Sequence, residues 1–224
     1  MKEFFKNFTD HPHMPKRMIL CFISVSIMGF CVYWLDRLAW GTDPCSTMTL
    51  ALSAKVGLSL GTFQALFNTL LFVIVLLKDK KQIGFGTLFN MFVVGYAYNF
   101  MAFCMKKLGV DYHFPKVHFG AGFVLNDFLW NLLFCVILLA IFVFFASIYM
   151  SVELGTAPYD ALPVIIANSQ KKLSFRTIRI IWDVTFTAVG FLFGGTVGIV
   201  TVIMALTIGP MVAFVGKKIG KFLE

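Results

Sequence analysis

Gly41-Thr42-Asp43-Pro44 returns later in this sequence as Gly155-Thr156-Ala157-Pro158. Further matches follow both stretches in the same order and at a nearly constant spacing. The first copy contributes Ser59, Thr62, Gly84, Thr87, Gly95 and Phe100, which match Ser174, Thr177, Gly198, Thr201, Gly209 and Phe214. These ordered identities indicate an internal duplication. Duplicated membrane proteins usually place a ligand site where the two copies meet.

The composition around this repeat is that of a membrane protein. The chain has 224 residues, of which 59% are hydrophobic and 13% charged, whereas a soluble domain carries about 25% charged residues. The apolar runs are continuous, and a membrane barrel would instead need segments of alternating polarity. The sequence therefore predicts an all-α polytopic protein of the bacterial plasma membrane, with the lipid bilayer as its main partner.

The net charge of +8 has an explanation in the membrane. Lys and Arg gather at the ends of the apolar runs, as they do at the cytoplasmic ends of membrane helices, so we expect no nucleic-acid partner. The five cysteines form no CxxC pair, which argues against a disulfide framework and a metal site. Both termini are expected on the cytoplasmic side.

The apolar runs predict three spanning helices and one short helix in each copy. A span needs about 20 apolar residues, so the short helices that begin at Pro44 and Pro158 are expected to enter the membrane without crossing it. The spans are expected at residues 18–38, 60–77, 86–105, 127–150, 175–193 and 198–218, and the half-helices at 44–56 and 158–169. The chain then divides into a tail (1–16), repeat 1 (17–108), a loop (109–126) and repeat 2 (127–221).

The orientation of the two repeats has two solutions. Half-helices that re-enter the membrane give three crossings in each copy and therefore inverted repeats. Half-helices that cross give four crossings and parallel repeats. The count of Lys and Arg on each side is nearly the same for both arrangements, so only the shortness of the half-helices favours inverted repeats.

Charged residues inside a span are costly, by about 2.5–3.5 kcal/mol each, and need a reason. Asp160 lies in the first turn of the second half-helix, and Arg179 and Asp183 lie four residues apart on the next span, on one helix face. The aligned residues of the first copy are polar but uncharged: Ser46, Gln64 and Asn68. The pattern predicts a polar cavity between the copies, charged on one side and neutral on the other. The alternatives are that Arg179 and Asp183 form a purely structural pair, or that these residues lie at the membrane interface with no special role.

The turns before the half-helices also admit two interpretations. They consist of Gly41, Thr42 and Pro44 in the first copy and of Gly155, Thr156 and Pro158 in the second. Their glycines permit a sharp entry and their prolines start the helix. The free N–H groups of the first turn either bind an anion or are simply capped. No catalytic or metal-binding arrangement is evident in the sequence, so we expect neither an enzyme nor a cofactor or metal.

The motifs of the second copy resemble a known family. They read G-T-A-P-Y-D from Gly155, Arg179-x-x-x-Asp183-Val184, and G-G-T-V-G-I from Gly194. Together they resemble the YczE/YyaS/YitT family of bacterial integral membrane proteins, and most closely its YczE-like branch. Phe175 and Val200 stand where that family usually has Gly. The resemblance implies a plasma-membrane location and a suspected transport role without an agreed substrate.

These observations lead to two functional hypotheses. The first is a transporter of an unidentified small solute, in which Arg179 orients an anionic group and Asp160 binds a cationic group or carries a proton. The second is a non-transporting accessory protein that supports another membrane or biosynthetic complex. A homo-oligomer is compatible with both hypotheses.

Overall fold

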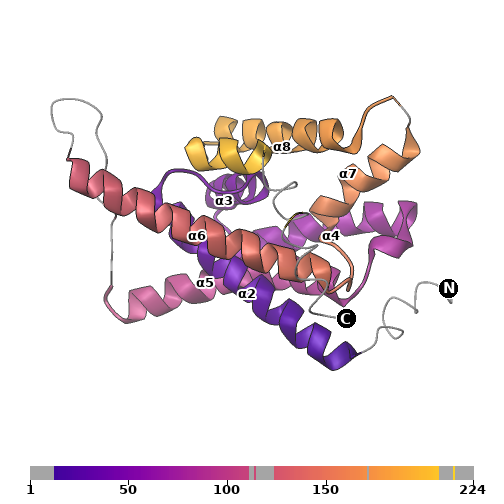
Figure 1. Cartoon of the computed structure of the whole chain (residues 1–224), viewed down its shortest axis with the longest axis horizontal. Helices are drawn as coiled ribbons and strands as arrows, with labels where there is room; N and C mark the ends of the chain where they lie inside the picture. Colours follow the sequence, from indigo (N-terminus) through magenta and orange to yellow (C-terminus); the bar gives the residue numbers. More distant parts are fainter. Residues whose placement is uncertain (1–12, 111–113, 115–123, 171, 207–213, 215–224) are drawn as a thin grey trace.

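The structure is a computed structural model, and it describes residues 13–110, 114, 124–170, 172–206 and 214. Within these ranges the regular structure is helical (Figure 1). The elements are α2 (Met14–Leu38), α3 (Pro44–Val56), α4 (Leu60–Lys78), η1 (Lys80–Gln82), α5 (Phe85–Lys107), α6 (Leu125–Ser151), α7 (Pro158–Ser169) and α8 (Phe175–Leu192). Residues 199–206 are also helical. The all-α prediction is confirmed for this part of the chain.

Two of these helices are short, as the Pro-started turns predict. Helix α3 has 13 residues and α7 has 12, so each is about 20 Å long at 1.5 Å per residue. The hydrocarbon core of a bilayer is about 30 Å thick, and neither helix can cross it alone. Both run between the residues expected from the sequence.

Among the described residues, four helices are long and apolar enough to cross a membrane: α2, α4, α5 and α6. The sequence predicts six spans, and four of them are found in this part of the chain. Helix α8 is not among these candidate spans, because it carries Arg176, Arg179 and Asp183 within 18 residues. The last expected span begins with the helical residues 199–206, and most of its remainder lies outside the described residues.

Identical caps begin α4 and α8. The Ser59 hydroxyl accepts a hydrogen bond from the Thr62 N–H over 3.2 Å, and the Ser174 hydroxyl accepts one from the Thr177 N–H over the same distance. A capping serine satisfies one of the N–H groups that lack a partner at a helix start. The aligned Ser-x-x-Thr pairs therefore fix both helix starts by the same means.

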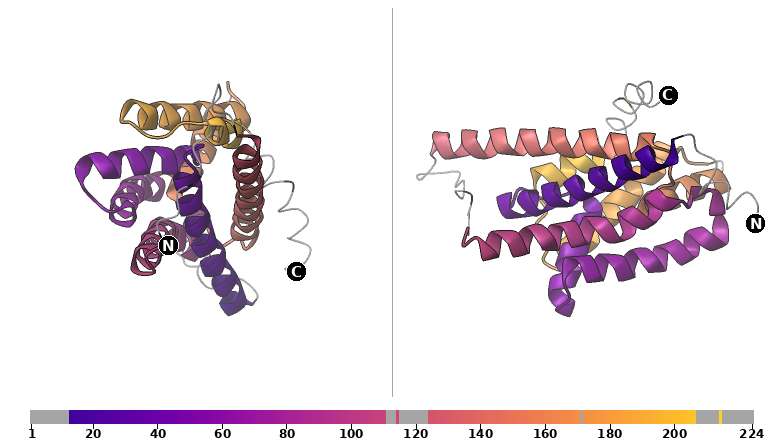
Figure 2. Two further views of the ribbon diagram at one scale, coloured as in Figure 1. Left: turned by 90° about the vertical axis from the view of Figure 1, so that its left-hand side faces the viewer. Right: turned by 90° about the horizontal axis from the view of Figure 1, so that it is seen from below.

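The helices pack in an interleaved order. Helix α2 lies against α5 and α6, α4 lies against α5 and α7, and α3 lies against α8. Figure 2 shows the long helices side by side along the longest axis of the molecule. Val25, Val32 and Leu35 of α2 are almost fully buried in the main apolar cluster, while large side chains such as Leu70 and Trp130 stay exposed on the outer surface. Such an apolar exterior suits a lipid environment.

Two equivalent backbone contacts join the aligned segments. The Gly86 N–H donates to the Leu154 carbonyl over 2.7 Å, and the Val200 N–H donates to the Trp40 carbonyl over 3.1 Å. Gly86 aligns with Val200, and Trp40 aligns with Leu154. Each segment therefore holds the turn that precedes the other segment's short helix.

Glycines make these contacts close. Gly84 presses against the Leu154 carbonyl and Gly198 against the Trp40 carbonyl, and a side chain at either glycine would overlap that carbonyl oxygen. Gly41 and Gly155, in the turns themselves, have φ angles of 99° and 91°, which favour glycine. The repeated glycines are thus explained by backbone geometry at the junction.

Candidate functional site

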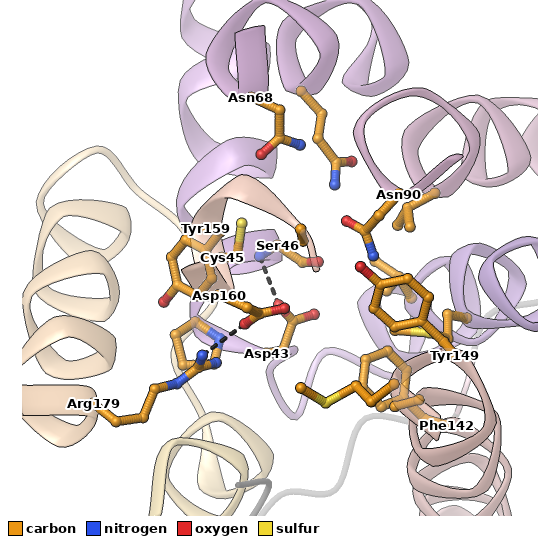
Figure 3. Close-up of a pocket in the computed structure, with 18 of the residues that line it drawn as sticks. Asp43, Cys45, Ser46, Asn68, Asn90, Phe142, Tyr149, Tyr159, Asp160 and Arg179 are labelled. Atoms are coloured by element: carbon orange, nitrogen blue, oxygen red, sulfur yellow. Dashed lines mark hydrogen bonds and ion pairs between the residues drawn. The ribbon is translucent and has the colours of Figure 1, made fainter. Parts of the chain in front are cut away.

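A cavity of about 440 Å³ lies among α2 to α8 (Figure 3). Its volume is within the range of small-molecule sites, about 300–1,000 Å³. Apolar side chains such as Met28, Val32 and Val94 form much of its wall. The polar side chains that line it are Asp43, Ser46, Gln64, Asn68, Asn90, Tyr149, Ser151, Tyr159, Asp160 and Arg179. Residues from both aligned segments therefore line the same space.

Arg179 is held between two carboxylates. Its Nη1 donates to Asp160 Oδ1 over 2.6 Å, and its Nε donates to Asp183 Oδ2 over 3.0 Å. The Arg179 and Asp160 side chains are 19% and 25% exposed, so this pair faces the cavity, whereas the Asp183 side chain is fully buried. Because both neighbours are anionic, the positive charge of Arg179 is already compensated.

Asp183 serves as an anchor behind the cavity wall. Its Oδ1 accepts a hydrogen bond from the Tyr159 hydroxyl over 2.7 Å, and its Oδ2 accepts the one from Arg179. The Arg179 guanidinium lies 5.4 Å from the centre of the Tyr159 ring, in a cation–π contact. Both oxygens of Asp183 are occupied, so this residue ties α7 to α8.

The cavity contains five of the six residues predicted to form the polar site. Asp160, Arg179, Ser46, Gln64 and Asn68 all line it, and Asp183 does not. Among the residues of the predicted turns, only Pro44 lines it. Gly41, Thr42, Gly155, Thr156 and Pro158 lie in the turns and at the start of α7, where the Thr156 N–H donates to the Gln82 carbonyl over 3.0 Å.

Sequence reasoning did not assign Asp43, Asn90, Tyr149 and Tyr159 to the cavity. Asp43 has a visible role as the cap of α3, since its Oδ2 accepts a hydrogen bond from the Ser46 N–H over 3.0 Å. It aligns with the uncharged Ala157, so a comparison of polar residues shared by the two copies does not select Asp43. The first copy is therefore not neutral at this site, and the predicted division into a charged and an uncharged side is wrong.

Asp43 and Asp160 point toward one another in Figure 3. Asp43 is the N-cap of α3 and Asp160 lies in the first turn of α7, so each short helix brings one carboxylate to the cavity. At the start of α3 the capping interpretation holds, because the chain's own Asp43 accepts the N–H bond that a bound anion would accept. Among the described residues, no cation pairs with Asp43.

The buried amides complete the polar side of the cavity. Asn68 is 1% exposed and Asn90 is 8% exposed, and both direct their side chains into the space in Figure 3. The Asn68 Oδ1 atom is buried without a hydrogen-bond partner. A buried acceptor of this kind costs about 1–3 kcal/mol when left unpaired. A ligand that donates a hydrogen bond to Asn68 Oδ1 would remove this cost.

Comparison with known proteins places the chain in a family. An uncharacterized protein of Haemophilus influenzae is 25% identical over 199 residues, which are 89% of this chain and 83% of that protein. The uncharacterized protein YyaS of Bacillus subtilis is 25% identical over 194 residues, 86% of this chain and 88% of its own length. The latter supports the YyaS part of the resemblance, while the YczE-like branch stays a prediction. No solved structure matches the chain. Residues 15–217 match the family model DUF6198, a family of unknown function, and the chain therefore belongs to the DUF6198 family.

Proposed function

We propose that the protein is a small-solute transporter whose binding site is the cavity between the two repeats. The observation that carries this proposal is the cavity itself, a space of about 440 Å³ lined by charged and polar side chains as well as apolar ones, inside a set of strongly apolar helices. Polar and charged groups are costly at membrane depth and usually mark a substrate or ion pathway. A purely structural ion pair would need no such space beside it.

The arrangement of the aligned segments supports the same proposal. Transporters built from repeats bind their solutes at the repeat interface, near helices that are interrupted or short. Here the turns before α3 and α7 are each held by the partner segment, through the Val200–Trp40 and Gly86–Leu154 hydrogen bonds. We propose that the repeats are inverted and that one rocks against the other around the cavity. The carboxylates of Asp43 and Asp160 would then stay at the centre of the motion.

The test is access to the cavity from both sides of the membrane. Cys45 lines the cavity, while Cys21, Cys31 and Cys135 are buried in the apolar core. With Cys104 replaced by Ser, an impermeant thiosulfonate reagent is applied to sealed right-side-out and inside-out vesicles. Asn90→Cys, in a chain that also carries Cys45→Ala, is a second reporter on α5, and the chain with neither cysteine is the matched control.

A transporter requires that both reporters react from both sides, because the cavity opens alternately to each. Reaction from one side only would contradict the proposal. That result would favour the accessory-protein hypothesis, in which the cavity is a fixed pocket and the Arg179 network is structural.

A further inference from the structure

The charges around the cavity do not balance. Asp43, Asp160 and Asp183 contribute three carboxylates, and Arg179 contributes the one cation that pairs with two of them. The N-termini of α3 and α7 add roughly half a positive charge each. With all three carboxylates ionised, the sum over these described groups is about one negative charge. This imbalance disfavours an anionic solute at Arg179, the role first expected for that residue.

The surplus acceptors lie on the cavity side of the network. Asp183 is turned away from the cavity with both oxygens occupied, whereas Asp43 and Asp160 face it and each use one oxygen in a hydrogen bond given above. The Asn68 Oδ1 atom, buried and without a partner, also belongs to the cavity wall. Carboxylate and amide oxygens can only accept hydrogen bonds. The site therefore has more charged acceptors than charged donors, although neutral groups that can donate, such as the Tyr149 hydroxyl and the Gln64 amide, also line it.

We infer that the cavity binds a small organic ammonium ion, with its N–H groups directed at Asp43, Asp160 and Asn68. An ammonium supplies both the positive charge and up to three donors. The apolar wall formed by side chains such as Met28, Val32 and Phe142 then suits the hydrocarbon part of the molecule. A bare metal ion fits less well, because Ca²⁺ or Mg²⁺ takes about six or more oxygen ligands and the cavity is far larger than an ion. This inference rests on the proposed function, because it names the solute class of the same cavity.

The first experiment measures the sign of the field in the cavity. In detergent, where both faces are accessible, Cys45 is modified by a cationic and by an anionic thiosulfonate reagent of similar size, and mercaptoethanol is the reference thiol. We expect the cationic-to-anionic rate ratio at Cys45 to exceed that of mercaptoethanol by about tenfold or more, given the energy of unit charges a few ångströms apart. Asp43→Asn should lower the ratio, while Glu153→Gln, which removes an exposed carboxylate outside the cavity lining, should not.

The second experiment identifies the ligand class by protection of Cys45. Benzylamine should slow the modification, while benzyl alcohol, benzoate and sodium chloride at matched ionic strength should not. Asn68→Ala should weaken protection by benzylamine without changing the rate ratio, since it removes an acceptor and no charge. Asp43→Asn should weaken both.

Three results would overturn the inference. They are a rate ratio that Asp43→Asn does not change, stronger protection by benzoate than by benzylamine, and protection by sodium ions alone. Because these measurements use detergent-solubilised protein, they do not depend on two-sided access. A cation site that is reached from only one face would support this inference and contradict transport.

Discussion

The two short helices begin alike and use their carboxylates differently. At α7, Asp160 is paired with Arg179, which Asp183 holds from behind. At α3, Asp43 caps its own helix through the Ser46 N–H and pairs with no cation among the described residues. On α4, Gln64 and Asn68 replace the Arg179 and Asp183 of α8. The carboxylates at α7 and α8 are therefore paired with Arg179. The carboxylate of Asp43 at α3 and the amide oxygen of Asn68 on α4 stay available to a ligand.

The largest expected effect comes from breaking the closed network at its buried anchor. Asp183→Ala leaves Arg179 and Tyr159 without their shared acceptor, and loss of one partner from a buried ion pair costs about 3–5 kcal/mol. We expect a large drop in the unfolding midpoint of the detergent-solubilised protein.

The aligned residue on α4 provides the matched control for Asp183. Asn68→Ala should cost only about 1 kcal/mol or less, as is typical of single polar contacts between membrane helices, because its Oδ1 atom has no partner to lose. Equal losses at Asp183 and Asn68 would show that the two segments do not differ in the way described.

The glycine contacts test where the two segments are equivalent. Gly84→Ala and Gly198→Ala should each destabilise the protein by about 1–3 kcal/mol, the usual cost of overpacking, because each added methyl group meets a backbone carbonyl. Leu66→Ala, at an exposed position of α4, is the control for thermal unfolding. A large loss at one glycine and none at the other would break the equivalence.

A smaller effect is expected from neutralising the cavity carboxylate of α7. Asp160→Asn weakens the short hydrogen bond from Arg179 but leaves the guanidinium paired with Asp183. Hydrogen bonds to charged groups contribute about 1.5–3 kcal/mol, and the partial exposure of the pair places the loss at or below the lower end. The unfolding midpoint measured against wild type is the readout, and a loss as large as that of Asp183→Ala would contradict the anchoring role of Asp183.

The smallest effect on stability is expected at Asp43. Asn caps a helix about as well as Asp, so Asp43→Asn should change the free energy of unfolding by no more than about 0.5 kcal/mol. The same variant should lose amine protection of Cys45. If Asp43→Asn weakens ligand binding and leaves folding intact, Asp43 differs from Asp183 as described. A severe loss of stability would show that the two residues do not differ in this way.

Much of the fold followed from local signals in the sequence. Pro44 and Pro158 mark the starts of α3 and α7, and the Ser59 and Ser174 caps mark those of α4 and α8. These signals act over three or four residues, so they can be recognised in the sequence without knowledge of tertiary contacts. The number of candidate spans was less predictable, because α8 carries three charged residues within its 18 positions.

The composition of the site was predictable only in part. Spacing places Arg179 and Asp183 on one face of a helix, yet it cannot tell which of them reaches the cavity and which is buried behind it. Asp43 precedes Pro44, where a helix cap is common, and nothing in its neighbours reveals that the same carboxylate also faces Asp160. Asn90 and Tyr149 lie on α5 and α6, outside the aligned polar pairs, so only the packing of distant helices brings them to the cavity.

The most direct test of the central claim is an experimental structure of the full chain in lipid nanodiscs with benzylamine. We predict that the amine lies in the cavity with its nitrogen within hydrogen-bond distance of Asp43, Asp160 and Asn68, and that Arg179 keeps both of its carboxylate partners. An amine bound only outside the cavity, or benzoate bound at Arg179 in a parallel sample, would contradict the account.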